Sequence, residues 1–319
     1  MSNVRAGVVG VGHMGRYHVG AYTEILDVDL VGVCDINAEN ANAVADHFSL
    51  EASTDYRDLF GKVDVVSIAV PTEFHVPVAR DFLEAGIHVL LEKPIARSFQ
   101  DAHELFAFAR NKDLVLQIGH VERFNSAIHE MKKIVENPII FESRRIGPFT
   151  GRNADDGVVL DLLIHDIDIV LQLAGSPVVD IQAVGKSVVS GRDDVASLQM
   201  RFESGCLAHL LASRVSEEKI RTLAVTQPGA YVFLDYTDQE IHIHRQASSE
   251  SMMTSDQLRY KQESIIERIF VYKGNPLKLQ LQHFIDSATK KREVMVSAEE
   301  ELHSLRVALD VLDRIKDEI

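Results

Sequence analysis

A glycine-rich turn near the start of the chain constrains the fold more than any other feature. An apolar, strand-like run at 4–9 leads into GVGHMG at 10–15, and a helical pattern follows at 17–26. In such a turn the first glycine bends the chain, the second lets the backbone approach a pyrophosphate, and the third allows close helix packing. Free amides at the helix start then bind the phosphates. The residues expected to bind a dinucleotide here are Gly10, Gly12, His13, Met14 and Gly15.

Asp35 directly follows the next apolar run, at 30–34. An acidic residue about 20 positions after the glycine turn accepts hydrogen bonds from the adenosine ribose and repels a 2′-phosphate. The expected cofactor is therefore NAD rather than NADP. Alternatively, Asp35 is a turn residue or the N-cap of the helix expected at 38–48.

Strand and helix patterns keep alternating up to residue 120. Further strands are expected at 63–70, 87–91 and 114–118, with helices at 75–85 and 99–111. This alternation is typical of right-handed βαβ units in a doubly wound parallel sheet. We predict an α/β protein whose residues 1–120 form an NAD-binding Rossmann domain.

Residues that follow these strands are candidates for the ligand crevice, because ligands of open α/β sheets bind beyond the carboxyl ends of the strands. Pro71, Thr72 and His75 follow one strand, although Pro71 and Thr72 also suit a loop and helix cap. Glu92 and Lys93 follow the buried run at 87–91, and an ammonium group there is suited to hold or exchange a substrate proton. The alternative is an ordinary surface lysine.

The pattern changes after residue 120. A helix at 121–137 and a strand at 139–146 precede a series of alternating segments with no long helix between them. These are expected at 181–189, 195–202, 208–215, 220–226, 231–234, 240–244 and 269–272. We predict a second, α+β domain at 121–319 with a large, open, mostly antiparallel sheet. An apolar outer face would pair with a second copy, so a homodimer or homotetramer is expected. Helices at 275–290 and 297–319 close the chain.

The segment 157–173, GVVLDLLIHDIDIVLQL, is the most informative helix. An apolar stripe lies beside a polar stripe formed by Asp161, His165 and Asp168 at helical spacing. An aspartate one turn from a histidine orients the imidazole and raises its basicity, as a general base needs. A buried structural pair remains the alternative. We expect no metal: HExxH is absent, and His242 and His244 suit a solvated strand face better than a two-histidine site.

Three arginines, Arg144, Arg145 and Arg152, lie near a glycine- and proline-containing loop. They suit either general surface solubility or an anion site that binds a phosphate-bearing substrate.

Composition excludes several classes of protein. A chain of 319 residues is long enough for two cores, and its formal charge of −15 argues against nucleic acid or an acidic membrane as partner. Cys34 and Cys206 cannot form a disulfide framework, and neither a signal peptide nor a membrane span is evident. These features together predict a cytoplasmic protein.

With these residues identified, the chain resembles the Gfo/Idh/MocA family of NAD(P)-dependent sugar and cyclitol oxidoreductases. The likeness is carried by VVGVGHMGRYH, VPTEFH, LEKP and DLLIHDID and spans essentially the whole chain. It implies a Rossmann domain, an α/β domain whose open sheet serves oligomerisation, and catalytic roles for Lys93, Asp161 and His165. The segment IGHVERFN, with Arg123 and Asn125, is similar to nucleotide-sugar members such as UDP-N-acetylglucosamine 3-dehydrogenases, which implies substrate contacts at both residues.

The expected reaction is NAD-dependent oxidation of a secondary hydroxyl of a sugar or nucleotide sugar. His165 is the expected base, Asp161 its orienter, and Lys93 the group that stabilises the developing alkoxide, although Lys93 itself is an alternative base. These roles require Lys93 and His165 to share a cavity. The alternatives are a free monosaccharide or inositol dehydrogenase and a non-catalytic NAD-binding sensor.

Overall fold

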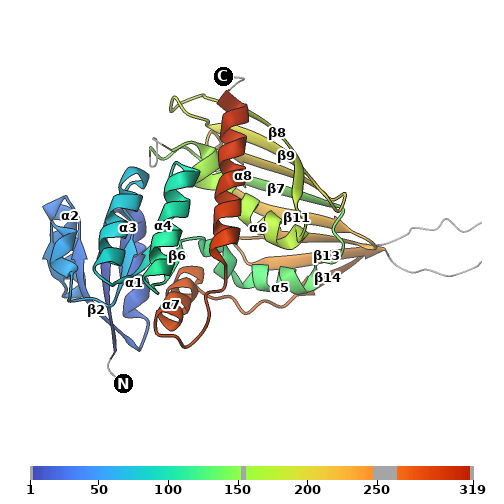
Figure 1. Cartoon of the computed structure of the whole chain (residues 1–319). Coiled ribbons are helices and arrows are strands. Elements are labelled where there is room, and N and C mark those ends of the chain that lie inside the picture. Colours follow the sequence, from blue (N-terminus) through green and yellow to red (C-terminus); the bar gives the residue numbers. More distant parts are fainter. Residues whose placement is uncertain (1–2, 152–155, 247–263, 317–319) are drawn as a thin grey trace, which may run out of the picture. The chain divides into compact units, whose positions relative to one another are not determined.

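The computed structural model describes residues 3–151, 156–246 and 264–316. The chain forms two compact units (Figure 1). The first comprises Met1–Phe124 and Asn275–Asp310, and the second comprises Asn125–Gly274 and Val311–Ile319. No helix within the described ranges is long and apolar enough to cross a membrane.

The first unit is built on a parallel sheet whose strand order, β3-β2-β1-β4-β5-β6, is that of a Rossmann fold. Its strands are β1 (Val4–Val9), β2 (Val28–Cys34), β3 (Glu51–Ser53), β4 (Val65–Ile68), β5 (His88–Leu91) and β6 (Leu116–Ile118). The helices between them are α1 (His13–Thr23), α2 (Ala38–Phe48), α3 (His75–Glu84) and α4 (Phe99–Asn111). Short 3₁₀ turns occur at Tyr56–Leu59, Thr72–Phe74 and Val121–Phe124. The predicted doubly wound sheet is confirmed.

Two C-terminal helices also belong to this first unit, which differs from the boundary predicted at residue 120. They are α7 (Pro276–Ala288) and most of α8 (Ala298–Lys316). Leu277, Leu281 and Phe284 of α7 share one buried core with Val8 of β1 and Tyr22 of α1. The apolar face of α7 therefore completes the Rossmann core rather than the core of the second unit.

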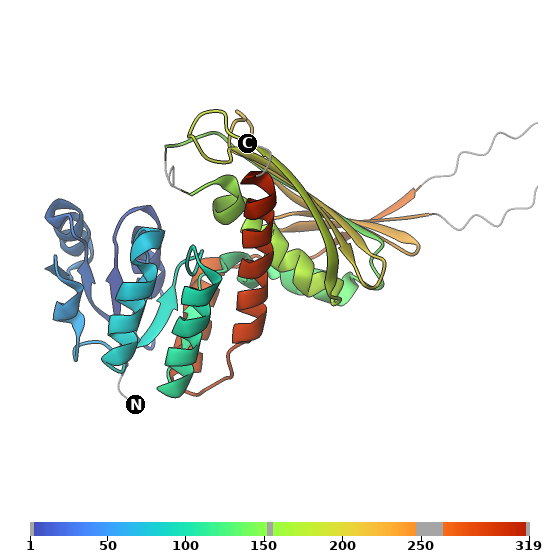
Figure 2. The same ribbon diagram turned by 45° about the horizontal axis from the view of Figure 1, so that its top comes forward.

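The second unit contains a sheet in the order β14-β13-β12-β11-β7-β10-β9-β8. Its strands are β7 (Ile140–Ile146), β8 (Val178–Lys186), β9 (Val195–Phe202), β10 (Leu207–Ser213), β11 (Ile220–Gln227), β12 (Ala230–Asp235), β13 (Glu240–Gln246) and β14 (Ser264–Ile269). Every pairing is antiparallel except that of β7 with β10. Helices α5 (Ser126–Ile134) and α6 (Ile164–Ala174) pack against this sheet (Figure 2).

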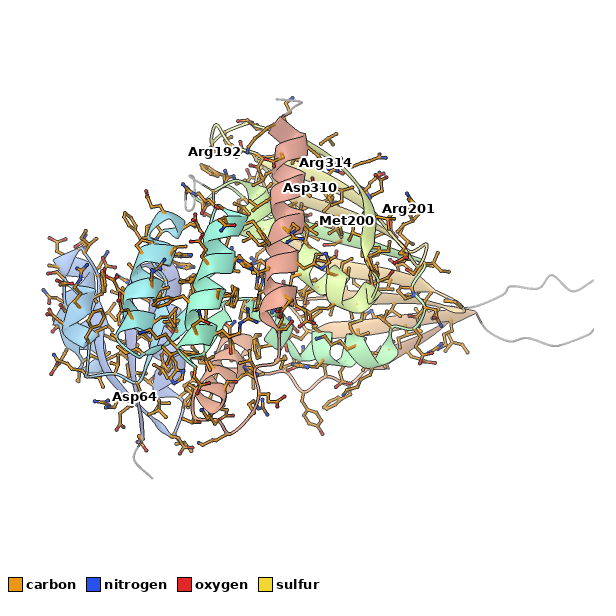
Figure 3. All side chains as sticks on the ribbon, in the orientation of Figure 1. Asp64, Arg192, Met200, Arg201, Asp310 and Arg314 are labelled. Carbon is orange, nitrogen blue, oxygen red and sulfur yellow. The ribbon has the colours of Figure 1, made fainter. Side chains whose placement is uncertain are left out.

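Side chains alternate across the sheet as strand geometry requires. In β9, Met200 is buried and the adjacent Arg201 is exposed (Figure 3). In β7, Phe141, Ser143 and Arg145 are buried, whereas Glu142 and Arg144 are exposed. One face therefore packs on α6, and the other carries polar residues together with some exposed apolar ones.

Several predicted boundaries were wrong. The helix expected at 121–137 is a 3₁₀ turn followed by α5, because the Asn125 side chain caps a new helix by accepting the amide of Ala127 at 3.0 Å. The last strand is Ser264–Ile269 rather than 269–272, where the strand-forming aromatics Phe270 and Tyr272 are exposed. Ser297 and Glu300 form a capping box at the start of α8. Glu300 Oε2 accepts the Ser297 amide at 2.8 Å, and Ser297 Oγ accepts the Glu300 amide at 3.2 Å.

Candidate cofactor and catalytic sites

The three glycines where β1 leads into α1 have different physical requirements. Gly10 has a φ of +82°, and a Cβ there would lie 2.6 Å from the carbonyl oxygen of Ala69. A Cβ on Gly15 would lie 1.8 Å from the carbonyl oxygen of Gly10, so α1 can approach the turn only with glycine at this position. A Cβ on Gly12 would have no described atom within 4 Å, so the backbone is open to a phosphate there. His13 and Met14 form the first turn of α1.

Asp35 is held at the end of β2 by two backbone amides. Its Oδ2 accepts the amide of Val11 at 2.9 Å, and its Oδ1 accepts the amide of Asn37 at 2.9 Å. The first bond ties the carboxylate to the glycine turn. Asn37, not Asp35, caps α2, because its side chain accepts the amide of Glu39 at 2.9 Å. This position next to the glycine turn suits a ribose-binding carboxylate.

His75 lies inside the protein, between the end of β4 and the Glu92-Lys93-Pro94 segment. Its Nδ1 is 2.7 Å from the carbonyl oxygen of Pro94, and its Nε2 is 2.9 Å from that of Val70. Carbonyl oxygens only accept, so both bonds together require a proton on each ring nitrogen. The side chain is buried, with 1% of its surface exposed. Thr72 is also buried, and Pro71 precedes it at the surface.

Glu92 is buried directly before the half-buried Lys93. Burial alone would raise the pKa of Glu92, but a hydrogen bond from His18, together with the positive charges of His18, Lys93 and His75, lowers it overall. Glu92 is thus held as a carboxylate. His18, on α1, was not singled out in the sequence, because a histidine on a helix does not reveal a partner on a distant strand.

The second unit carries the helix with the predicted Asp161 and His165. A π-helical turn at Val159–Leu163 precedes α6, so the expected single helix is distorted where Asp161 lies. Asp161 and His165 are half-buried, and His165 Nδ1 itself is buried. Such π turns occur often at functional sites. Asp168 instead is 2% exposed and accepts a hydrogen bond from Gln172 at 3.0 Å.

Two arginines of the predicted cluster, Arg144 and Arg145, lie on opposite faces of the sheet. Arg145 points to α6, where its guanidinium donates to both oxygens of Asp166 at 2.8 and 3.0 Å and lies over the ring of Tyr236. Arg144, its neighbour in β7, is exposed on the opposite face of the sheet. Arg144 and Arg145 therefore do not point to one site, because adjacent strand residues point to opposite faces, and the predicted anion contacts of Arg144 and Arg152 stay predictions. Arg152 lies outside the described residues.

Arg123 and Asn125 have structural partners. Arg123 is 2% exposed, and its Nη1 lies 2.5 Å from Oε1 of Glu301 on α8. Asn125 caps α5 and donates to the carbonyl oxygen of Tyr236 at 3.2 Å. Their predicted contacts with substrate stay predictions. Within the described part of the chain, no group of His, Cys, Asp or Glu side chains is arranged to hold a metal.

Two family models match the chain consecutively. The oxidoreductase family with an NAD-binding Rossmann fold matches residues 4–120, and the GFO/IDH/MocA C-terminal domain matches residues 117–232. The chain belongs to the Gfo/Idh/MocA family. The glycine turn and Asp35 fit the NAD that this Rossmann domain binds, so the Gfo/Idh/MocA chain is an NAD-dependent oxidoreductase, as the sequence predicted.

Individual members of this family are also similar to the chain. The chain is 37% identical over 249 residues to UDP-N-acetylglucosamine 3-dehydrogenase of Acidithiobacillus ferrooxidans, covering 78% of this chain and 79% of that protein. The solved structure of that enzyme matches with a TM-score of 0.89 at 32% identity and 99% coverage of both chains. Inositol 2-dehydrogenase of Corynebacterium glutamicum is 28% identical over 220 residues, covering 64% of this chain and 65% of that one.

Proposed function

We propose that this protein is a cytoplasmic dehydrogenase that oxidises a secondary hydroxyl of a nucleotide sugar, with C3 of UDP-N-acetylglucosamine as the first candidate. The observation that carries the proposal is the 37% identity to a UDP-N-acetylglucosamine 3-dehydrogenase over 78% of the chain. Lys93, Asp161 and His165, the residue types this chemistry needs, are all present.

NAD, when bound, accepts the hydride that leaves the carbinol carbon. The chain must then take the hydroxyl proton and stabilise negative charge on the oxygen. We assign Nε2 of His165 as the proton acceptor, because Nδ1 of this ring is buried. Asp161, four residues earlier, orients the imidazole. The Lys93 ammonium donates a hydrogen bond to the same oxygen, so its positive charge offsets the developing alkoxide.

Lys93 is the alternative proton acceptor. Lysine side chains ordinarily carry a positive charge at neutral pH, whereas an imidazole ordinarily exchanges protons near neutral pH. We therefore assign Lys93 the electrostatic role and His165 the role of base.

A free cyclitol is the second candidate substrate, because an inositol 2-dehydrogenase is also similar to the chain. NADH formation, followed by absorbance with a panel of UDP-sugars, free sugars and inositol, separates the two. Turnover of UDP-N-acetylglucosamine with a kcat/KM well above that of any free sugar or of inositol supports the proposal. A preference for inositol, or no turnover of any UDP-sugar, refutes it.

We also propose that the outer face of the second sheet joins copies of the chain into a homodimer or homotetramer. Val184, Leu207 and Tyr231 are exposed there at 52%, 45% and 38%. Exposed apolar residues on one sheet face suit an isologous contact. Leu207→Glu should shift the protein toward monomer in sedimentation experiments, and a monomeric wild-type protein at micromolar concentration refutes the contact.

A further inference from the structure

The helix that carries Asp161 and His165 begins without a capping side chain of its own, because Val158 precedes it. Asp193, in the turn before β9, supplies the missing acceptors. Its Oδ2 accepts the amide of Val159 at 2.9 Å, and its main-chain oxygen accepts the amide of Val158 at 2.8 Å. A residue 34 positions away thus satisfies two amides at the start of this helix.

Gly157 makes this approach possible. It is buried, and a Cβ at this position would lie 1.7 Å from Oδ1 of Asp193. Its carbonyl oxygen accepts the amide of Asp161 at 3.0 Å. Gly157 is therefore in contact with the Asp193 carboxylate on one side, and its carbonyl oxygen is hydrogen-bonded to the Asp161 amide on the other, so Gly157 links Asp193 to Asp161.

The turn that holds Asp193 is itself fixed by Asp194. Oδ2 of Asp194 accepts the amides of Val188, Val189 and Ser190 at 2.6, 2.6 and 3.0 Å. Nε of Arg214 donates to Oδ1 of Asp194 at 2.7 Å, and its Nη1 donates to the carbonyl oxygen of Asp156 at 2.9 Å. Arg214 therefore joins the Asp194 turn to the residue directly before Gly157.

We propose that Asp193 is a positioning residue for the Asp161/His165 pair, acting through the first turn of their helix. The functional part of this inference depends on the proposed role of His165 in catalysis. Asp193 touches no reacting atom in this scheme. It fixes the position and direction of the first helical turn. An error of about 1 Å in the position of a catalytic group can lower turnover by ~10².

Four variants test this role. Asp193→Ala removes the acceptor and should lower kcat by ~10 to 10² with little change in KM or in NAD affinity. Asp193→Asn keeps an acceptor oxygen and should retain most of the wild-type kcat. Gly157→Ala should displace Asp193 and resemble Asp193→Ala. Gly147→Ala is the matched control, because a Cβ there would have no described atom within 4 Å.

The double variant Gly157→Ala/Asp193→Ala separates this contact from general damage. Once the carboxylate is absent, the new methyl group has nothing to displace, so the double variant should be no slower than Asp193→Ala alone. Independent losses that multiply in the double variant overturn the inference, as does a wild-type kcat in Asp193→Ala.

Hydrogen–deuterium exchange gives a readout that does not depend on any substrate. Amides of residues 157–165 should exchange faster in Asp193→Ala and Gly157→Ala than in the wild type, Asp193→Asn or Gly147→Ala. Unchanged exchange in Asp193→Ala overturns the positioning role. Lack of wild-type turnover on every sugar refutes the proposed function instead, and the exchange result still decides whether Asp193 positions the helix.

Discussion

Nε2 of His18 lies 2.9 Å from Oε1 of Glu92, and the two side chains are 0% and 8% exposed. The carboxylate accepts, so His18 carries a proton on Nε2. Gly119 makes room for this pair, because a Cβ there would lie 2.8 Å from Oε1 of Glu92. A helix that begins at the glycine turn is thus bonded to the residue directly before Lys93.

Removal of His18 should leave a buried carboxylate with one partner fewer. His18→Leu is expected to cost ~3 to 5 kcal/mol of the free energy of unfolding at neutral pH, as measured by denaturant titration. His18→Gln, which keeps a donor, should cost less.

The pH dependence of that stability follows from Glu92. Burial opposes ionisation, but His18, Lys93 and His75 together lower the pKa of Glu92 below its ordinary value of 4.5. A carboxyl with a lowered folded-state pKa stabilises the protein above pH 4.5, and this contribution is lost as pH falls through the lowered pKa. In His18→Leu the loss should begin at higher pH. Identical pH profiles for wild type and His18→Leu would contradict the pairing.

Alanine substitutions at two glycines of α1, Gly15 and Gly20, should have opposite effects on stability. Gly15→Ala places a methyl group 1.8 Å from the Gly10 carbonyl oxygen, so it should abolish NAD binding or folding. Gly20→Ala meets no described atom within 4 Å and should raise the free energy of unfolding by ~0.5 to 1 kcal/mol. Thermal unfolding measures the stability of each variant, and titration with NAD measures its cofactor affinity. Equal effects of the two substitutions would contradict the close approach of Gly15 to the Gly10 carbonyl oxygen.

Asp35→Ala should weaken NAD binding and reduce discrimination against NADP. The charge that repels a 2′-phosphate is lost, together with the bond to the Val11 amide. Calorimetric titration with both cofactors measures the ratio of dissociation constants. Asp46→Ala, which removes an exposed carboxylate from α2, is the control and should leave that ratio unchanged. An unaltered ratio in Asp35→Ala would count against its ribose-binding role.

Alanine substitutions of the adjacent β7 residues Arg144 and Arg145 should differ sharply in their effect on the free energy of unfolding. Arg145→Ala leaves Asp166 buried without its bidentate partner and should cost ~3 to 5 kcal/mol of the free energy of unfolding. Arg144→Ala changes an exposed side chain and should stay within ~0.5 kcal/mol of the wild type. A loss for Arg144→Ala as large as that for Arg145→Ala would contradict this difference.

Much of the cofactor site was predictable because its signals are local. The glycine turn, the acidic residue after β2 and the alternation of strands and helices all lie within one continuous stretch, and each has a direct physical reason. The opposite orientation of Arg144 and Arg145 was missed, although the strand predicted at 139–146 implies it, since neighbours in a strand alternate.

The remaining features depend on contacts between distant segments. His18 and Glu92 are 74 residues apart, and nothing in either segment reveals the other. The amphipathic pattern of α7 indicates an apolar face but not which core receives it, and α7 packs in the first unit. Asp193 is an ordinary turn residue in the sequence, and only the fold brings its carboxylate to the start of the helix that carries Asp161.

The most direct test of the mechanism is the turnover of Lys93→Ala and His165→Ala with UDP-N-acetylglucosamine, followed as NADH formation, with NAD affinity measured in parallel. The mechanism predicts that kcat falls by ~10² to 10⁴ in each variant while the dissociation constant for NAD changes little. Wild-type turnover in both variants would contradict the assignment of proton transfer to His165 and charge stabilisation to Lys93.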